Sequence, residues 1–147
     1  MFSQTLEYAL RAAVWLAQNE GQPQTTQEVA RATQVPAHYQ SKVLQALGRA
    51  GLAQGTRGKH GGWVLTRPAS RIRVLDVVNG VEPVKRIRQC PLDLKSHGVK
   101  LCPLHARMDR ALAMIEESFA SVTLKELLDG GGAGGPASLC ESLEVLA

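Results

Sequence analysis

The sequence predicts a mainly α-helical fold with one small β-hairpin, arranged as a winged helix-turn-helix domain followed by a long helix. Two short helical segments with a tight turn between them lie between Thr25 and Gly51. A glycine-rich basic segment with apolar flanks follows directly, and apolar residues return at nearly heptad spacing from Leu101. We therefore divide the chain into a domain at 1–80, a Cys/His loop at 81–105, a long-helix region at 101–128 and a flexible glycine-rich tail at 129–147.

The first two helices are predicted from apolar spacing and capping residues. Near the N-terminus, apolar residues recur on one face of a helix: Leu6, Leu10, Ala13, Val14 and Ala17. A second, short helix is expected at Gln27–Ala32, with Thr25 or Thr26 as its N-cap. Residues 33–35 then read as a turn, so that a third helix can follow at an angle.

The third helix is expected to begin at about Pro36, because proline suits the first helical position, and to stop at Gly51. Apolar residues at helical spacing, Val43, Leu44 and Leu47, can pack inward. The remaining face near the N-terminal end is polar, and this end enters the major groove in helix-turn-helix proteins. The polar candidates for base contacts are His38, Tyr39, Ser41, Lys42 and Gln45.

The segment from Leu52 to Thr66 contains four glycines between apolar flanks, which predicts two short strands joined by a loose tip. The tip holds the candidate phosphate contacts Arg57, Gly58, Lys59, His60 and Gly61. Glycines let the backbone approach a phosphate closely, and the cations can neutralise it or enter a minor groove. Such a loop alone is more often a solvated hairpin, but its position directly after the helix pair favours a wing that binds double-stranded DNA.

Two further helices are predicted after the wing. Residues Val74 to Gly80 suit a short helix closed by glycine. The later apolar stripe spans about three heptads and contains Leu101, Leu104, Met108, Ala111, Leu112, Ile115, Phe119 and Val122. Periodicity alone leaves open whether this stripe packs on its own domain or on a second copy of the chain.

The segment from Cys90 to His105 is the candidate input site. Three cysteines, Cys90, Cys102 and Cys140, do not make a disulfide framework in a cytosolic protein, whereas Cys with His suggests a metal or a reactive thiol. His105 lies one helical turn from Cys102, and His97 lies in the loop between the first two cysteines. Donors of this kind suit a [2Fe-2S] cluster or tetrahedral zinc; a thiol sensor and a loop without cofactor remain alternatives. Cys140 is expected to be a bystander in the tail.

Composition places the DNA-binding charge in the first part of the chain. The chain has 147 residues, 44% hydrophobic and 20% charged, with a net charge of +4. Residues 1–89 carry 12 Lys/Arg against 5 Asp/Glu, whereas residues 90–147 carry 5 against 8. With no apolar run of about 18 residues and no signal peptide pattern, the protein is expected in the cytoplasm, without membrane contact.

Other classes of function find less support in the sequence. A redox carrier or enzyme would use the cysteines for chemistry, but no glycine-rich nucleotide motif or paired carboxylate accompanies them. A winged-helix protein-interaction module without affinity for DNA would not need the basic wing. We therefore expect a regulator and not an enzyme.

The order of these motifs resembles the Rrf2 family of bacterial transcriptional regulators. The resemblance runs from about Met1 to about Leu128. It rests on the helix Thr5-Leu-Glu-Tyr-Ala-Leu-Arg-Ala, the helix between Val35 and Leu52, the wing Arg57-Gly-Lys-His-Gly-Gly-Trp, and Val74-Leu-Asp-Val-Val-Asn-Gly-Val-Glu-Pro. It implies a homodimer with a long dimerisation helix, bound to palindromic promoter DNA.

The resemblance also implies a sensor of iron-sulfur cluster, redox or nitric oxide status. Family members that bind a cluster have three cysteines in the loop, but Ser96 stands midway between Cys90 and Cys102 here, so this site is not available. The remaining set is Cys90, Cys102 and His105, completed by His97 or, as the resemblance implies, by Glu7 from the partner subunit.

Overall fold

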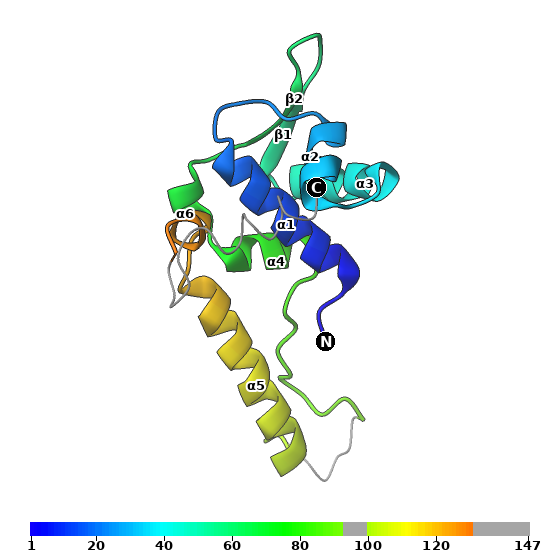
Figure 1. Ribbon diagram of the computed structural model, residues 1–147. Coiled ribbons are helices and arrows are strands. Elements are labelled where there is room, and N and C mark those ends of the chain that lie inside the picture. Colours follow the sequence, from blue (N-terminus) through cyan, green and yellow to red (C-terminus); the bar gives the residue numbers. More distant parts are fainter. Residues whose placement is uncertain (93–99, 131–147) are drawn as a thin grey trace.

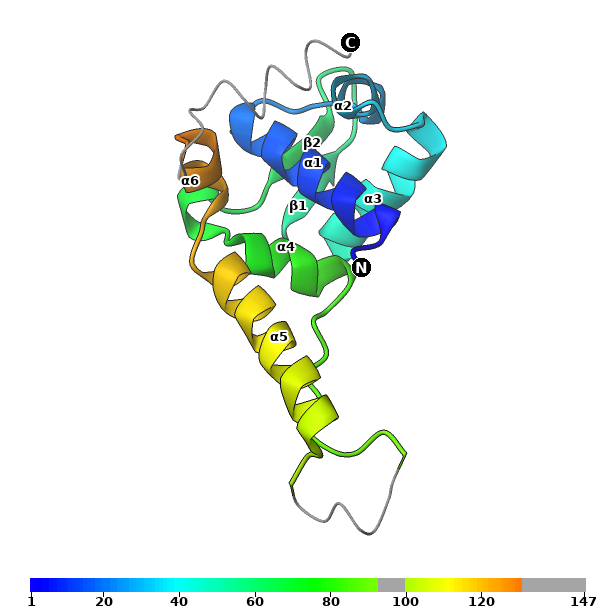
Figure 2. The same cartoon turned by 60° about the horizontal axis from the view of Figure 1, so that its bottom comes forward.

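The computed structural model describes residues 1–92 and 100–130 (Figure 1). Helices α1 to α4, the hairpin and α6 form one body, and α5 extends away from it (Figures 1 and 2). The two strands form a two-stranded antiparallel sheet. In chain order the elements are α1 (Gln4–Gln18), α2 (Thr26–Thr33), α3 (Ala37–Arg49), β1 (Ala53–Thr56), β2 (Gly62–Leu65), the 3-10 turn η1 (Ala69–Arg71), α4 (Val74–Val81), α5 (Pro103–Ala120) and α6 (Leu124–Leu128).

The core forms around α1, which contacts α2, α3, α4, α6 and the hairpin. Ser3 caps this helix by accepting a hydrogen bond from Leu6 N at 3.1 Å. The apolar face predicted for the first helix is buried within the same domain, with only Leu10 half-exposed. The three apolar residues predicted to point inward from α3 are buried in the same cluster. This larger cluster supports the helix-turn-helix, and a second, smaller cluster of Leu6, Val74 and Val78 joins α1 to α4.

Helix α2 begins with a capping box, because Glu28 N donates to Thr25 Oγ1 at 3.2 Å and Thr25 N donates to the Glu28 carboxylate at 2.7 Å. The turn after α2 passes through Gln34 in the left-handed region, with φ of 56°. Pro36 is the N-cap of α3 and not its first helical residue, a correction of one position. Behind the turn, buried Gln40 of α3 lies 3.1 Å from Thr33 Oγ1 and thereby joins the two helices.

The hairpin has the register Ala53 with Leu65 and Thr56 with Gly62. Its second strand is also paired on the other side, because Trp63 N donates to Gln24 O at 2.7 Å and Gln24 N donates to Trp63 O at 3.0 Å. At Gly62 a Cβ atom would lie 2.7 Å from the Gln24 backbone, so only glycine allows this approach. The wing is thus fixed to the segment that leads into α2.

Helix α4 corrects one prediction, since Gly80 lies inside the helix and does not close it. The helix continues to Val81, and a Cβ atom on Gly80 would lie 2.6 Å from Ala50 Cβ at the end of α3. This glycine is therefore a close contact between two helices. A stop signal and a packing glycine look alike in a sequence, because the difference lies in the partner helix.

Helix α5 is shorter than predicted, with Leu101 and Val122 outside it. Val74 N donates to Val122 O at 3.0 Å and Leu124 N donates to Ile72 O at 2.8 Å, so the chain pairs with the segment before α4 and leaves the helical path. Helix α6 then begins with its own N-cap, Thr123. Neither α6 nor η1 was predicted from the sequence.

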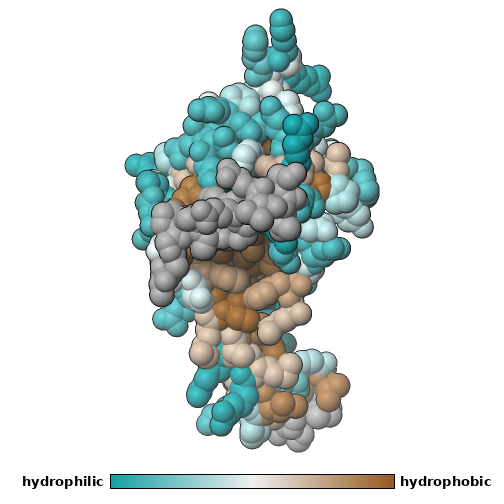
Figure 3. Space-filling view, in the orientation of Figure 1, coloured by the Kyte–Doolittle hydropathy of each residue, from teal (hydrophilic) through white to brown (hydrophobic). Residues whose placement is uncertain are grey.

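The long helix touches the body mainly at its C-terminal end. The rings of Phe2 and Phe119 lie 5.7 Å apart, and α5 contacts α4. No residue of α5 is fully buried. Apolar side chains gather over the middle of the molecule and continue onto α5 in the space-filling view (Figure 3).

Candidate nucleic-acid interface and sensor segment

The first turns of α3 present the predicted base-contacting residues to solvent. His38, Tyr39 and Lys42 are exposed and Ser41 is half-exposed. The Tyr39 ring lies 4.9 Å from the His38 ring and 5.8 Å from Lys42 Nζ, and it meets Tyr8 edge-on at 6.2 Å. These contacts hold the polar cluster in one orientation on the surface.

The N-terminal end of α3 has no side-chain cap, because its N-cap is Pro36. Free backbone amides and the helix dipole at such an end favour a phosphate group. Arg11 supports the turn from behind by donating from Nη1 to Thr33 O at 3.3 Å. Sequence reasoning identified the polar face of α3 but not the role of α1 in supporting it.

The hairpin loop extends away from the helices of the body (Figure 1). Arg57, Lys59 and His60 are all exposed, and none of them has a hydrogen bond or ion pair to any residue that the structure describes. The charges of Arg57 and Lys59 are therefore available to an external anion.

An open pocket of about 580 Å³ lies between the wing and the start of α2. Besides Arg57 and the glycine backbone, its lining includes Thr26, whose hydroxyl is a donor type that binds phosphate. The Thr25 and Thr56 hydroxyls already donate to the Glu28 carboxylate and to Gly62 O. Its lining consists of Thr25, Thr26, Gly55, Thr56, Arg57, Gly58, Gly61, Gly62 and Trp63. Sequence reasoning considered Thr25 and Thr26 only as caps and did not place them beside the wing.

Cys102 and His105 come together at the start of α5. Cys102 is the N-cap, where its Sγ accepts a hydrogen bond from His105 N at 3.5 Å and lies 3.2 Å from His105 Nδ1. Cys90 and Cys102 are both free thiols with half-exposed side chains. The N-terminal end of α5, which carries this pair, is the end farther from the body (Figure 2).

A metal or iron-sulfur centre needs more donors than this pair supplies. Glu7 lies exposed on α1 and forms an ion pair with Arg11 of the same helix. Ser96, His97 and Cys140 lie outside the described residues. Within the described residues of one chain, no group of three or more His, Cys, Asp or Glu side chains could hold a metal ion. These residues alone therefore do not fit a [2Fe-2S] cluster or a tetrahedral zinc ion.

An ionic cluster that the sequence did not reveal ties residues 86–87 to α5. Arg86 donates from Nε and Nη2 to the two Asp109 oxygens at 2.7 and 2.6 Å, and from Nη1 to Glu116 at 3.1 Å. Ile87 N also donates to Asp109 at 2.8 Å. The Arg86 hydrogen bonds, with the Ile87 amide, hold the pKa of Asp109 at about 2, below its usual 3.8. The segment that leads to Cys90 is thus fastened along α5.

Comparisons with known proteins agree with this geometry. A family described as "Rrf2: Iron-dependent Transcriptional regulator" matches residues 2–130. Protein aau3 of Rhizobium meliloti (strain 1021) is 34% identical over 123 residues, which cover 82% of this chain and 80% of that protein.

Two solved structures share the fold at lower identity. The T. potens IscR structure has a TM-score of 0.74 at 23% identity and covers 90% of this chain and 88% of its own. CymR, described as the global cysteine regulator of B. subtilis, has a TM-score of 0.71 at 23% identity and covers 86% of this chain and 95% of its own. Among the described residues, no helix is long and apolar enough to cross a membrane.

Proposed function

The chain belongs to the Rrf2 family of DNA-binding transcriptional regulators, and on this premise we propose that it acts as a cytoplasmic homodimer on palindromic promoter DNA. The main supporting observation is that the exposed face of α3 and the unpaired wing cations are free for DNA, while α5 extends from the opposite end of the body (Figure 1). In this arrangement α3 reads bases and the wing with the start of α2 contacts phosphates.

The second copy of the chain would cover the apolar side of α5. Leu104 and Met108 are 64% and 47% exposed, which is unusual for apolar side chains on an 18-residue helix. Ile115 and Phe119 continue the stripe toward the body and are only half-buried. A symmetric pair of α5 helices would bury these side chains and set the distance between the two α3 helices.

The segment around Cys90, Cys102 and His105 would be the chemical input. A metal or iron-sulfur cluster bound here would need additional donors from His97 or from Glu7 of a second chain. The close Cys102–His105 pair also supports a thiol-based input without a cofactor. In either case the Arg86 cluster would pass a change near Cys90 to α5, and α5 would change the spacing of the α3 helices.

Selection on fragmented genomic DNA tests this function directly. The wild-type chain should retain specific fragments, and fluorescence anisotropy on these fragments should show affinity that falls steeply with salt. Replacing Arg57 and Lys59 with alanine should weaken binding to all sequences and reduce the slope of log K against log salt by about 2. Arg88→Ala, an exposed arginine outside the proposed interface, is the matched control. An unchanged slope in the double wing variant would refute the wing assignment.

A further inference from the structure

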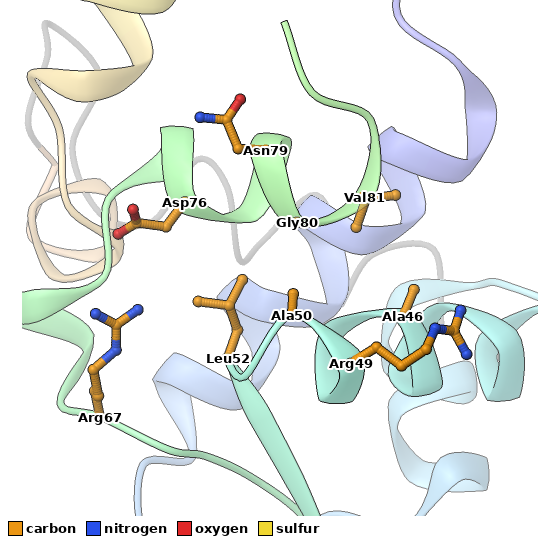
Figure 4. A pocket seen from close by; sticks show the side chains of 9 residues that line it. All are labelled: Ala46, Arg49, Ala50, Leu52, Arg67, Asp76, Asn79, Gly80 and Val81. Atoms are coloured by element: carbon orange, nitrogen blue, oxygen red, sulfur yellow. The ribbon is translucent and has the colours of Figure 1, made fainter.

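A second pocket lies on another part of the body, between the end of α3 and α4 (Figure 4). It has a volume of about 520 Å³, within the range of small-molecule sites. Apolar side chains, Ala46, Ala50, Leu52 and Val81, form part of its lining. None of the residues assigned above to DNA or to the chemical input lines it.

Two arginines stand on opposite sides of this pocket, Arg49 at the end of α3 and Arg67 after β2 (Figure 4). Neither side chain has a hydrogen bond or ion pair to another residue in the part of the chain that the structure describes. Between them lie Ala50, Leu52 and Gly80 (Figure 4). The pocket thus combines two available guanidinium groups with an apolar middle.

The other polar groups of the pocket are partly used by the protein itself. Asp76 accepts a hydrogen bond from Arg73 N at 2.8 Å, which caps α4, and Asn79 Oδ1 accepts one from Val84 N at 3.4 Å. The amide nitrogen of Asn79 remains a donor. Counting Asp76 against the two arginines, the pocket keeps a net charge of +1. Its available chemistry therefore favours an anion.

The geometry points to a binding site for a small organic carboxylate with a short apolar body, held by Arg49 and Arg67. Guanidinium groups bind carboxylates with strong, directional hydrogen bonds, and the apolar lining accommodates the carbon chain. This ligand site is independent of the Cys/His segment and goes beyond the proposed function.

The pocket borders the tightest contact between α3 and α4, where Gly80 meets Ala50. A ligand that contacts both helices would favour one spacing between them. Because α3 carries the proposed base-contacting residues at its other end, the ligand would change the affinity for DNA. Only this effect on the affinity for DNA rests on the proposed function.

Isothermal titration of the full chain with succinate, butyrate and inorganic phosphate, at constant ionic strength, tests the site. We expect saturable binding of succinate with one molecule per chain. Arg49→Gln and Arg67→Gln should each weaken it about tenfold, because each removes a charge-assisted hydrogen bond. Arg71 is an exposed arginine outside the pocket, and Arg71→Gln should leave succinate binding unchanged. Butyrate has one carboxylate and should lose affinity in only one of the two pocket variants.

Three results would overturn the proposal. These are no saturable binding of either carboxylate, binding of phosphate alone, and succinate binding unchanged in both pocket variants. If Arg49 and Arg67 instead contact DNA phosphates, each variant will lower the salt slope of DNA binding by about 1 while succinate does not bind. Titration does not involve DNA, so it can succeed or fail independently of the proposed regulator function.

Discussion

Replacing Gly80 with alanine tests the close contact between α3 and α4. The new Cβ would lie 2.6 Å from Ala50 Cβ and 3.4 Å from Leu52 Cδ1. Carbon atoms pack best at about 3.5–4.0 Å, so the two helices would have to separate by about 1 Å. Overpacking of this kind costs about 1–3 kcal/mol, while alanine in place of glycine inside a helix contributes about 1 kcal/mol of stability. We expect a net loss of up to about 2 kcal/mol.

Urea unfolding followed by circular dichroism measures this loss, at one protein concentration throughout. The informative control is the reciprocal change Ala50→Gly, which removes the methyl group that Gly80→Ala would meet. The double variant should be more stable than Gly80→Ala alone, although glycine near a helix end lowers stability by itself. If Ala50→Gly destabilises the Gly80→Ala variant as much as it destabilises the wild type, the two positions are not coupled, and the assignment of Gly80 as a packing glycine is wrong.

Three further predictions address the dimer, the input and the ionic cluster. Ile115→Asp should place an unpaired charge in the proposed α5 interface and yield monomers by sedimentation at micromolar concentration; a dimeric variant would assign the dimer to another surface. If the input is a metal or cluster, protein purified without oxygen should contain iron or zinc in proportion to dimer, and Cys102→Ala or His105→Ala should lose most of it. If the protein stays metal-free after attempted reconstitution, the input is not a metal or cluster, and a thiol-based input or no input remains. Because the Arg86 hydrogen bonds lower the pKa of Asp109 to about 2, this contact contributes stability that is full above about pH 4 and is lost as the pH falls toward 2. The difference in urea midpoint between wild type and Asp109→Asn should therefore shrink over that interval, and a constant difference would contradict the assignment.

The sequence predicted those elements whose signals are local. The α2 start was indicated by Thr25 and the wing by its glycines, because capping and turn residues act within a few positions. The end of α5 was missed, since it depends on pairing between Thr123 and Arg73, far apart in sequence. The same holds for Gly80, whose role depends on a neighbouring helix. The start of α6 carries a local signal, the capping box of Thr123 and Glu126, which the sequence analysis overlooked.

The candidate sites also divide into those with a local sequence signal and those formed by residues far apart in the sequence. The exposed face of α3 and the wing tip follow from residue types in one short segment, so they could be predicted residue by residue. Arg86 could not be recognised, because its partner Asp109 is 23 residues away and many surface arginines have no partner. The pocket between α3 and α4 combines three separate segments, and no motif in any of them indicates it.

The incomplete burial of α5 in the single chain has a consequence for the response in a cell. If the helix gains its apolar contacts only through association, the stability of the dimer rises with the concentration of the protein. Dimer concentration then follows the square of monomer concentration when most chains are monomeric. Occupancy of a promoter would rise more steeply than expression of the regulator, so a modest change in its synthesis could switch a promoter even without a chemical signal.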